Sequence, residues 1–277
     1  MPEITAVIFM TDNIRTWVSG LSIIQMDVME GHNPNRIHIS EMPKNTGMCT
    51  GVIRRGKTTI LSFDKGYLLF SYQLSGKIIL DSSSRQPHTR VVIKLSNGKK
   101  LLWIDKINFG SIHWFTNLSN LKNKQQNLGP EFWPIQKSGE WWKNICNSKS
   151  AIHKVLIDQK RVAGIGNIIA IETLHRSGIH PSKPANTISP IQWDKLAKSI
   201  RMVVKESQDQ HNALREKQIK QGIFNGNLDF VSEGHTRAEG YQIYGREHED
   251  CPQCKKASII KIRLAGRPIY LCPKCQY

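Results

Sequence analysis

The last 27 residues contain the feature that most restricts the fold, two Cys-x-x-Cys pairs. Cys251 and Cys254 form the first pair, Cys272 and Cys275 form the second, and 17 residues separate the two. Thiolates two residues apart on a tight knuckle can bind one ion, and two knuckles complete a tetrahedral four-sulfur site. The spacing therefore predicts one structural Zn²⁺ ion, and it suits iron less well. Two disulfide bonds are the alternative interpretation.

The segment between the pairs has the pattern of a β-hairpin. Residues 259–262 and 268–271 resemble two short strands joined by a turn at 264–267. Arg267 lies at the expected tip, and further lysine and arginine side chains are close in sequence. A basic tip on a rigid hairpin suits a phosphate or a nucleic-acid groove. A zinc ribbon with a purely structural role remains the alternative.

The charge of the chain indicates a polyanionic partner. Its 277 residues contain 39 Lys and Arg against 22 Asp and Glu, a net charge of +17. Nucleic acid and an anionic membrane surface are the two candidates. No apolar run reaches 18 residues, so we expect no membrane span, and Glu3 stands where a signal peptide needs basic residues. Cys49 and Cys146 have no local partner, which is typical of a reducing compartment, the cytoplasm (nucleoid) or the nucleus.

The length of the chain is sufficient for two domains. Short apolar runs separated by turns predict strands over most of residues 1–120, at a spacing typical of a β-sandwich or barrel. Residues 4–18 are the exception, because their apolar spacing predicts a helix. The expected strands are 52–53, 58–63, 67–72, 77–80, 89–95 and 101–105.

The second half of the chain has helical periodicity. Residues 121–145 are interpreted as a polar and then Trp- and Pro-rich connection, with a domain boundary at 128–131. Tryptophans in such a connection are more often packing residues than stacking platforms. Helices are then predicted near 152–156, over 168–175 and over 190–217, and a mobile loop over 218–240.

The N-terminus could carry chemistry. Removal of the initiator methionine would expose Pro2, a secondary amine that is partly unprotonated and nucleophilic at neutral pH. Such an amine can attack a sugar C1′ and form an iminium, and Glu3 beside it could transfer protons. Taken alone, a chance Met-Pro-Glu start is the more common explanation.

Two further stretches suit phosphate binding. Residues 164–167, Gly-Ile-Gly-Asn, precede a predicted helix, where free N–H groups and the helix dipole favour an anion. Asn167 could donate to a phosphate or simply cap the helix. Residues 54–57, Arg-Arg-Gly-Lys, lie between two strand patterns, and Lys57 could contact a phosphate or act as a second catalytic amine. A solvated basic turn is the alternative.

Together, and in this order, these stretches resemble the formamidopyrimidine-DNA glycosylase / endonuclease VIII family. The resemblance covers nearly the whole chain and is densest over residues 156–181 and 241–277. The motifs that carry it are Pro2-Glu3, Lys57, the run from Asp158 to Asn167, Ser177-Gly178-Ile179-His180-Pro181, and Tyr244-Gly245-Arg246-Glu247 before the four-cysteine finger with Arg267.

The resemblance implies an α+β, multidomain fold. Residues 1–128 would form an N-terminal β-sandwich with a flanking helix, and residues 129–240 a helix–two-turn–helix DNA-binding domain. Residues 241–277 would form a zinc β-hairpin finger. The two lobes would make a clamp with DNA in the cleft.

The resemblance also implies a base-excision-repair enzyme that is both a DNA glycosylase and an abasic-site lyase. Damaged DNA would be the partner, duplex preferred and single-stranded DNA possible, and the protein would be a monomer. Pro2 would attack C1′ of the flipped nucleotide, Glu3 would act as general acid and base, and Lys57 would assist β,δ-elimination. The implied DNA-binding residues are Leu74, Phe109, Asn167, Glu172 and Arg267.

The chain departs from the family pattern at several positions. Ala6 stands where the family has a second acid that positions the flipped nucleotide, and Ser71 replaces a phosphate-binding histidine. Ile107 and Asn108 replace two arginines, one of which reads the opposite base in some members. These losses keep a second hypothesis open, a non-catalytic or weakly catalytic DNA-damage-binding protein on the same fold.

Overall fold

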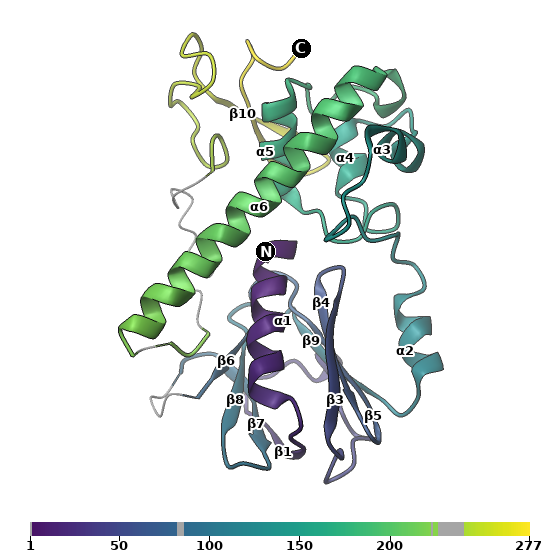
Figure 1. The fold of residues 1–277 in the computed structure, drawn as a ribbon, viewed down its shortest axis with the longest axis vertical. Coiled ribbons are helices and arrows are strands. Elements are labelled where there is room, and N and C mark those ends of the chain that lie inside the picture. The colour runs from purple at the N-terminus through teal and green to yellow at the C-terminus, as the bar shows by residue number, and fades with distance from the viewer. Residues whose placement is uncertain (1, 82–85, 223, 227–240) are drawn as a thin grey trace. The chain divides into compact units, whose positions relative to one another are not determined.

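The computed structural model describes residues 2–81, 86–222, 224–226 and 241–277, which fall into two units. The first unit consists of the described residues up to 126 together with 211–222 and 224–226, and the second of residues 127–210 and 241–277. Two sheets form most of the first unit (Figure 1). The five-stranded sheet has the order β2 (Ile37–His38), β9 (Ser111–Phe115), β5 (Gly66–Ser71), β4 (Thr58–Phe63) and β3 (Cys49–Arg55).

The second sheet has four strands in the order β1 (Ile23–Val28), β7 (Thr89–Leu95), β8 (Lys100–Ile104) and β6 (Lys77–Leu80). Neighbouring strands are antiparallel in both sheets, except for the short parallel pair β2–β9. Along β7, Val91, Ile93 and Leu95 are buried while the residues between them are partly exposed, the two-residue period of a half-buried strand. Phe70 and Trp103 stack across the two sheets, with ring centroids 5.7 Å apart. The predicted sandwich is confirmed.

Helix α1 (Ile4–Val18) completes the core of the first unit, as its periodicity predicts. Val7, Met10, Ile14 and Val18 share one face and are buried in the same cluster as the inner residues of both sheets. Glu3 is the N-cap residue, so the helix begins directly after Pro2 and Glu3.

The connection between the two units contains helices that the sequence analysis did not predict. Helix α2 (Leu118–Gln125) begins at Asn117, and α3 (Gly139–Cys146) begins at Ser138; both residues cap their helix through a side-chain oxygen. Trp142 of α3 is buried against Phe132, which agrees with a packing role. The predicted connection over 121–145 therefore overlaps two short helices.

The second unit contains α3, α4 (Ile152–Leu156), α5 (Asn167–Ser177) and the beginning of α6 (Pro190–Lys220). Its C-terminal hairpin consists of β10 (Ile260–Leu264) and β11 (Arg267–Leu271), paired antiparallel as predicted. Short 3₁₀ turns lie at Pro34–Arg36 in the first unit and Ala185–Thr187 in the second. Helix α6 ends three residues later than predicted, inside the expected 218–240 loop, and residues 223 and 227–240 of that loop lie outside the described residues.

None of the helices in the described ranges combines the length and the apolar composition that a membrane crossing requires.

Candidate functional site

The candidate catalytic residues of the first unit gather at the start of α1. The carboxylate of Glu3 lies 3.5 Å from the Lys57 ammonium, and the two side chains are only 6% and 17% exposed. Lys57 occupies the turn between β3 and β4, where the positive φ of Gly56 reverses the chain. Pro2, next to Glu3, is also buried. The structure thus brings together an acid and an amine that are 54 positions apart in sequence.

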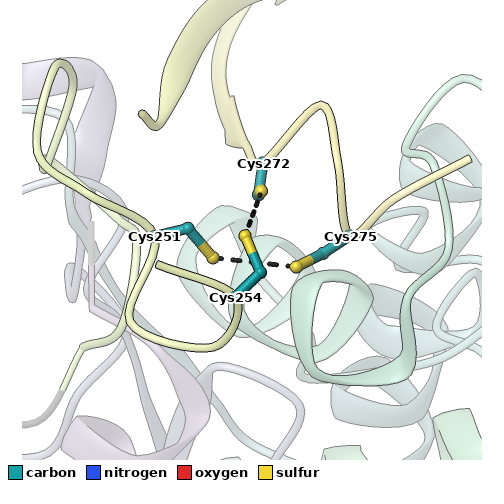
Figure 2. A group of neighbouring side chains, drawn as sticks. All are labelled: Cys251, Cys254, Cys272 and Cys275. Atoms are coloured by element: carbon teal, nitrogen blue, oxygen red, sulfur yellow. Dashed lines mark hydrogen bonds between the residues drawn. The ribbon is translucent and has the colours of Figure 1, made fainter. Parts of the chain in front are cut away.

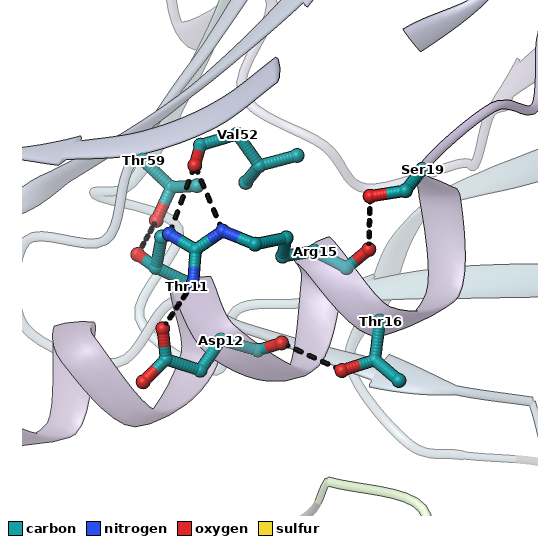
Figure 3. Close-up of polar contacts among 7 residues, drawn as sticks. All are labelled: Thr11, Asp12, Arg15, Thr16, Ser19, Val52 and Thr59. Atoms are coloured by element: carbon teal, nitrogen blue, oxygen red, sulfur yellow. Dashed lines mark hydrogen bonds and ion pairs between the residues drawn. The ribbon is translucent and has the colours of Figure 1, made fainter. Parts of the chain in front are cut away.

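Polar contacts hold α1 against the strands that carry Lys57 (Figure 3). The Arg15 guanidinium donates two hydrogen bonds to the Val52 carbonyl of β3, at 2.9 and 3.2 Å. The hydroxyls of Thr11 on α1 and Thr59 on β4 lie 2.7 Å apart, and the Tyr72 hydroxyl donates to Thr59. Burial raises the pKa of Tyr72, so its hydroxyl keeps its proton. These contacts fix the position of Glu3 relative to the β3–β4 turn.

At position 6, where the resemblance implies an acid, this chain has an alanine that makes apolar contacts. Ala6 is buried with Phe9, and both pack against Leu214 of α6 and Phe224. Ser71 lies at the end of β5, opposite Ser111 of β9. At neither position does the side chain supply a charge.

Leu74 and Phe109, the expected wedge residues, lie on two neighbouring loops of the first unit. They are 42% and 48% exposed, and Ile107 between them in sequence is 48% exposed. Buried Asp105 holds the loops together, because its carboxylate accepts hydrogen bonds from the Ser75 hydroxyl and the Gly110 N–H. Exposed apolar side chains on rigid loops are suited to insertion between bases.

The Asn108 side chain is not available to read a base in this arrangement. Its amide nitrogen donates to the Gly31 carbonyl at 2.7 Å, and its φ of 65° lies in the left-handed region that asparagine tolerates. The loop therefore presents Ile107 and Phe109 as its exposed apolar side chains.

In the second unit, Asn167 does not cap α5, which corrects one of the two sequence interpretations. The N-cap residue is Gly166, without a side-chain cap, and Asn167 is the first helical residue. Its amide nitrogen donates to the Pro268 carbonyl at 3.1 Å, and its amide oxygen accepts from His153 at 3.0 Å. Burial lowers the pKa of His153 to about 4, and nearby Arg267 adds to this effect. Asn167 thus lies beside the exposed hairpin tip that carries Arg267.

Glu172 was expected among the DNA-binding residues, but the structure assigns it a different contact. The residue is fully buried, and its carboxylate accepts the backbone N–H groups of Gln242, Ile243 and Tyr244 at 2.8 to 3.0 Å. Burial raises the pKa of Glu172, against the opposing effect of these hydrogen bonds. This contact attaches the finger to α5, and a role of Glu172 toward DNA stays a prediction.

The four predicted cysteine ligands converge on one point (Figure 2). All four sulfur atoms lie within 4.8 Å of one another, and the pairs Cys251–Cys275 and Cys254–Cys272 are each 3.7 Å apart. A tetrahedral site with Zn–S bonds of about 2.3 Å requires sulfurs about 3.8 Å apart. The cluster therefore fits a four-sulfur metal site.

One neighbour of this cluster was missed by the sequence analysis. His175 of α5 is fully buried, and its Nε2 lies 3.3 Å from the Cys251 sulfur. The available signal was its position one turn after Glu172 on the same predicted helix. The other two cysteines, Cys49 and Cys146, are buried free thiols, and burial raises the pKa of Cys146 to about 12.

Comparison with known proteins gives a consistent result along the chain. Residues 1–112 match the model of the formamidopyrimidine-DNA glycosylase N-terminal domain, and residues 128–218 match that of its H2TH domain. The formamidopyrimidine-DNA glycosylase of Pelotomaculum thermopropionicum is 30% identical over 291 residues, covering 100% of this chain and 99% of that protein. That of Rickettsia conorii is 28% identical over 288 residues, with both chains fully covered.

Solved structures agree with these relatives. A Lactococcus lactis Fpg in complex with DNA containing an abasic site has a TM-score of 0.79 and 25% identity, with both chains fully covered. MutM in complex with DNA containing carbocyclic 8-oxo-G has a TM-score of 0.78 and 26% identity, with 99% of each chain covered. From the two matching domains and the relatives that cover its whole length, the chain belongs to the formamidopyrimidine-DNA glycosylase family.

Proposed function

We propose that this protein removes damaged bases from DNA and then cleaves the strand at the resulting abasic site, with Pro2 as nucleophile. The observation that carries the proposal is the buried pair of Glu3 and Lys57 beside Pro2. A carboxylate next to a secondary amine can take its proton, and a neighbouring ammonium stabilises the carboxylate. Relatives bound to abasic-site and 8-oxo-G DNA indicate the substrate class.

In the proposed reaction, the Pro2 nitrogen attacks C1′ of the flipped nucleotide, and the bond from C1′ to the base breaks. The departing base takes a proton, for which Glu3 is the candidate donor. The sugar ring then opens to an iminium, which acidifies the C2′ proton. Loss of that proton expels the 3′ phosphate, and loss of the C4′ proton then expels the 5′ phosphate. Water hydrolyses the remaining iminium and releases the Pro2 amine. Lys57 would assist these eliminations by its positive charge.

For DNA binding, we propose that Leu74 and Phe109 fill the space left by the flipped nucleotide. Their exposure on loops held by Asp105 supports this role. Asn167 and Arg267 would contact phosphates, because both lie at the junction of the α5 N-terminus and the hairpin tip. The metal would be one structural Zn²⁺ held by Cys251, Cys254, Cys272 and Cys275, which would fix the hairpin and take no part in the chemistry.

A second candidate function is recognition of damaged DNA with little or no catalysis. The apolar environment of Ala6 and the absence of charge at Ile107 are the observations that favour it. The presence of Pro2, Glu3 and Lys57 argues against it, because a protein that only binds DNA does not need a nucleophilic amine.

A borohydride trap separates the two candidates. The protein without its initiator methionine is incubated with a labelled duplex containing one abasic site, reduced with borohydride, and separated on a denaturing gel. We expect a covalent adduct and strand cleavage, both abolished or sharply reduced in Pro2→Gly and in a form that retains Met1, while DNA binding is largely kept. Damage-specific binding without an adduct would overturn the lyase proposal and support the binding function.

A further inference from the structure

Helix α5 contacts the finger along its length, and the contacts begin at its first turn. Asn167 donates to the Pro268 carbonyl of the hairpin, and Glu172 accepts three N–H groups from residues 242–244 at the start of the finger. At the other end, Gly178 ends the helix with a φ of 70°. The absence of a side chain there leaves room for the Cys275 carbonyl, which would lie 3.2 Å from an added Cβ. The finger is therefore fixed to α5 at both ends of the helix.

His175 adds a contact of a different kind, because it reaches a metal ligand itself. Its Nε2 lies 3.3 Å from the Cys251 sulfur, and both residues are fully buried. A metal-bound thiolate has no proton and can only accept a hydrogen bond. The imidazole must then present Nε2–H to the sulfur. Hydrogen bonds to charged acceptors contribute more than neutral ones, and their strength increases in a buried site.

We propose that His175 is a positioning residue of the metal site, whose Nε2–H stabilises the Cys251 thiolate and links metal affinity to helix α5. This inference rests on the proposed occupancy of the four-cysteine site. It goes beyond that proposal, because it assigns a group outside the ligand set that determines how tightly the ion is held. Residues that contact the ligands of a metal typically change its affinity by about 10- to 100-fold when replaced.

Three variants of the full-length protein test this role. His175→Leu replaces the imidazole donor with an apolar side chain of similar size, whereas His175→Gln offers an amide N–H in place of Nε2–H. Thr173→Val is the matched control, because Thr173 is buried on the same helix and its hydroxyl has no hydrogen-bond partner among the described residues. Circular dichroism checks that each variant is folded.

The measurements are Zn²⁺ affinity, by competition with a chromophoric chelator, and the absorption spectrum of the Co²⁺-substituted protein. We expect His175→Leu to bind Zn²⁺ about 10- to 100-fold more weakly, with His175→Gln recovering most of the affinity and Thr173→Val matching the wild type. The sulfur-to-cobalt charge-transfer band should move to longer wavelength in His175→Leu, because an unbonded thiolate gives up an electron more easily.

Each alternative result has a separate meaning. Wild-type affinity in His175→Leu, or equal weakening in His175→Leu and His175→Gln, would overturn the hydrogen-bond role, the second by indicating a packing effect. A wild-type protein that binds neither Zn²⁺ nor Co²⁺ would overturn the proposed metal site itself. Because catalysis by Pro2 is measured separately in the borohydride trap, neither result is confused with failure of the proposed function.

Discussion

Glu3 and Lys57 illustrate how the chemistry depends on single residues. Their charged groups are 3.5 Å apart and mostly shielded from water, so the ion pair is stronger than an exposed one. Glu3 also lies at the N-cap of α1, where the positive end of the helix dipole favours a carboxylate. Both effects hold the Glu3 carboxylate in place beside Pro2.

Glu3→Gln should therefore reduce cleavage while leaving DNA binding largely intact. An amide of the same shape cannot accept the proton released by the nucleophile, and loss of a general acid or base typically costs about 10²- to 10⁴-fold in rate. Single-turnover cleavage of abasic and oxidised-base duplexes would measure the effect. Glu41→Gln, at an exposed position of the same unit, is the control. Cleavage by Glu3→Gln at the wild-type rate would remove Glu3 from the mechanism.

At this scale the sequence identified candidate groups more reliably than it identified their partners. The four cysteines, Glu3 and Lys57 could be named because their motifs have a fixed spacing or position. The hydrogen bonds of Asn167 and Glu172 could not, because their partners, at Pro268 and at residues 242–244, are 70 or more positions away. A contact across that sequence distance depends on tertiary packing, which local patterns do not contain.

At the scale of elements, α1 and the β3–β4 hairpin must keep a fixed relative position for Glu3 and Lys57 to lie close together. The buried hydroxyl chain of Thr11, Thr59 and Tyr72 contributes to this, with successive oxygens 2.7 Å apart. Thr59 is its central member and is fully buried.

Thr59→Val should destabilise the first unit by about 2–3 kcal/mol, because it leaves two buried hydroxyls without a partner. We also expect slower cleavage, since α1 can then shift relative to Lys57. Urea unfolding and single-turnover kinetics would measure the two effects. Thr16→Val is the control, because that hydroxyl is exposed and bonds only within α1 (Figure 3). Equal stability of Thr59→Val and Thr16→Val would mean that the buried hydroxyl chain does not stabilise the contact between α1 and the strands.

The C-terminal hairpin is the element that presents Arg267. Ala265 and Gly266 both have positive φ, 49° and 77°, the conformation of a tight two-residue hairpin turn, and the exposed Arg267 follows directly. Four cysteine sulfurs cluster at the base of this hairpin.

Arg267→Ala should weaken DNA binding and reduce the slope of log K against log salt by about one, the contribution of one phosphate contact. Fluorescence anisotropy of a labelled abasic-site duplex at several salt concentrations would measure this slope. Lys256→Ala, which removes a basic side chain from the same finger away from the tip, is the matched control. Unchanged binding at every salt concentration would mean that the finger has only a structural role.

Elements were predictable where apolar periodicity and turn residues agreed. The strands at 58–63, 77–80 and 89–95 match the structure to the residue, as does the start of α6 at Pro190. The helices α2 and α3 were missed because each has only eight residues, too few to establish a period, and the aromatic residues of α3 favour strands as much as helices. Their start signals, Asn117 and Ser138, were present.

At the scale of the whole molecule, the charge of +17 is a property of the entire chain and not of one site. It suits a protein that searches DNA through contacts with phosphates, whatever the sequence. The histidines provide a second property of this scale, because each unit contains a buried histidine, apart from His175 beside the four-cysteine cluster, that is uncharged at neutral pH. They are His211 in the first unit and His153 in the second.

Burial lowers the pKa of both His211 and His153 to about 4, against smaller opposing hydrogen bonds from the Thr5 backbone and from Asn167. In the unfolded chain a histidine titrates near 6.5. Between these values the unfolded state binds more protons, so the contribution of each histidine to stability is complete above pH 6.5 and is lost as the pH falls toward 4. Each should add about 1.4 kcal/mol per pH unit to the slope of unfolding free energy within this window.

Replacement of one buried histidine should therefore flatten the pH dependence. The free energy of unfolding in urea, measured from pH 7 to pH 4.5, should fall less steeply in His211→Gln than in the wild type, by about one proton. His248→Asn, which changes a histidine with an 88% exposed side chain, should retain the wild-type slope. Subtracting the unfolding free energies of one variant from those of the other at each pH cancels the carboxylate titrations, which both variants share. Parallel curves for His211→Gln and the wild type would mean that His211 is not kept neutral by the fold.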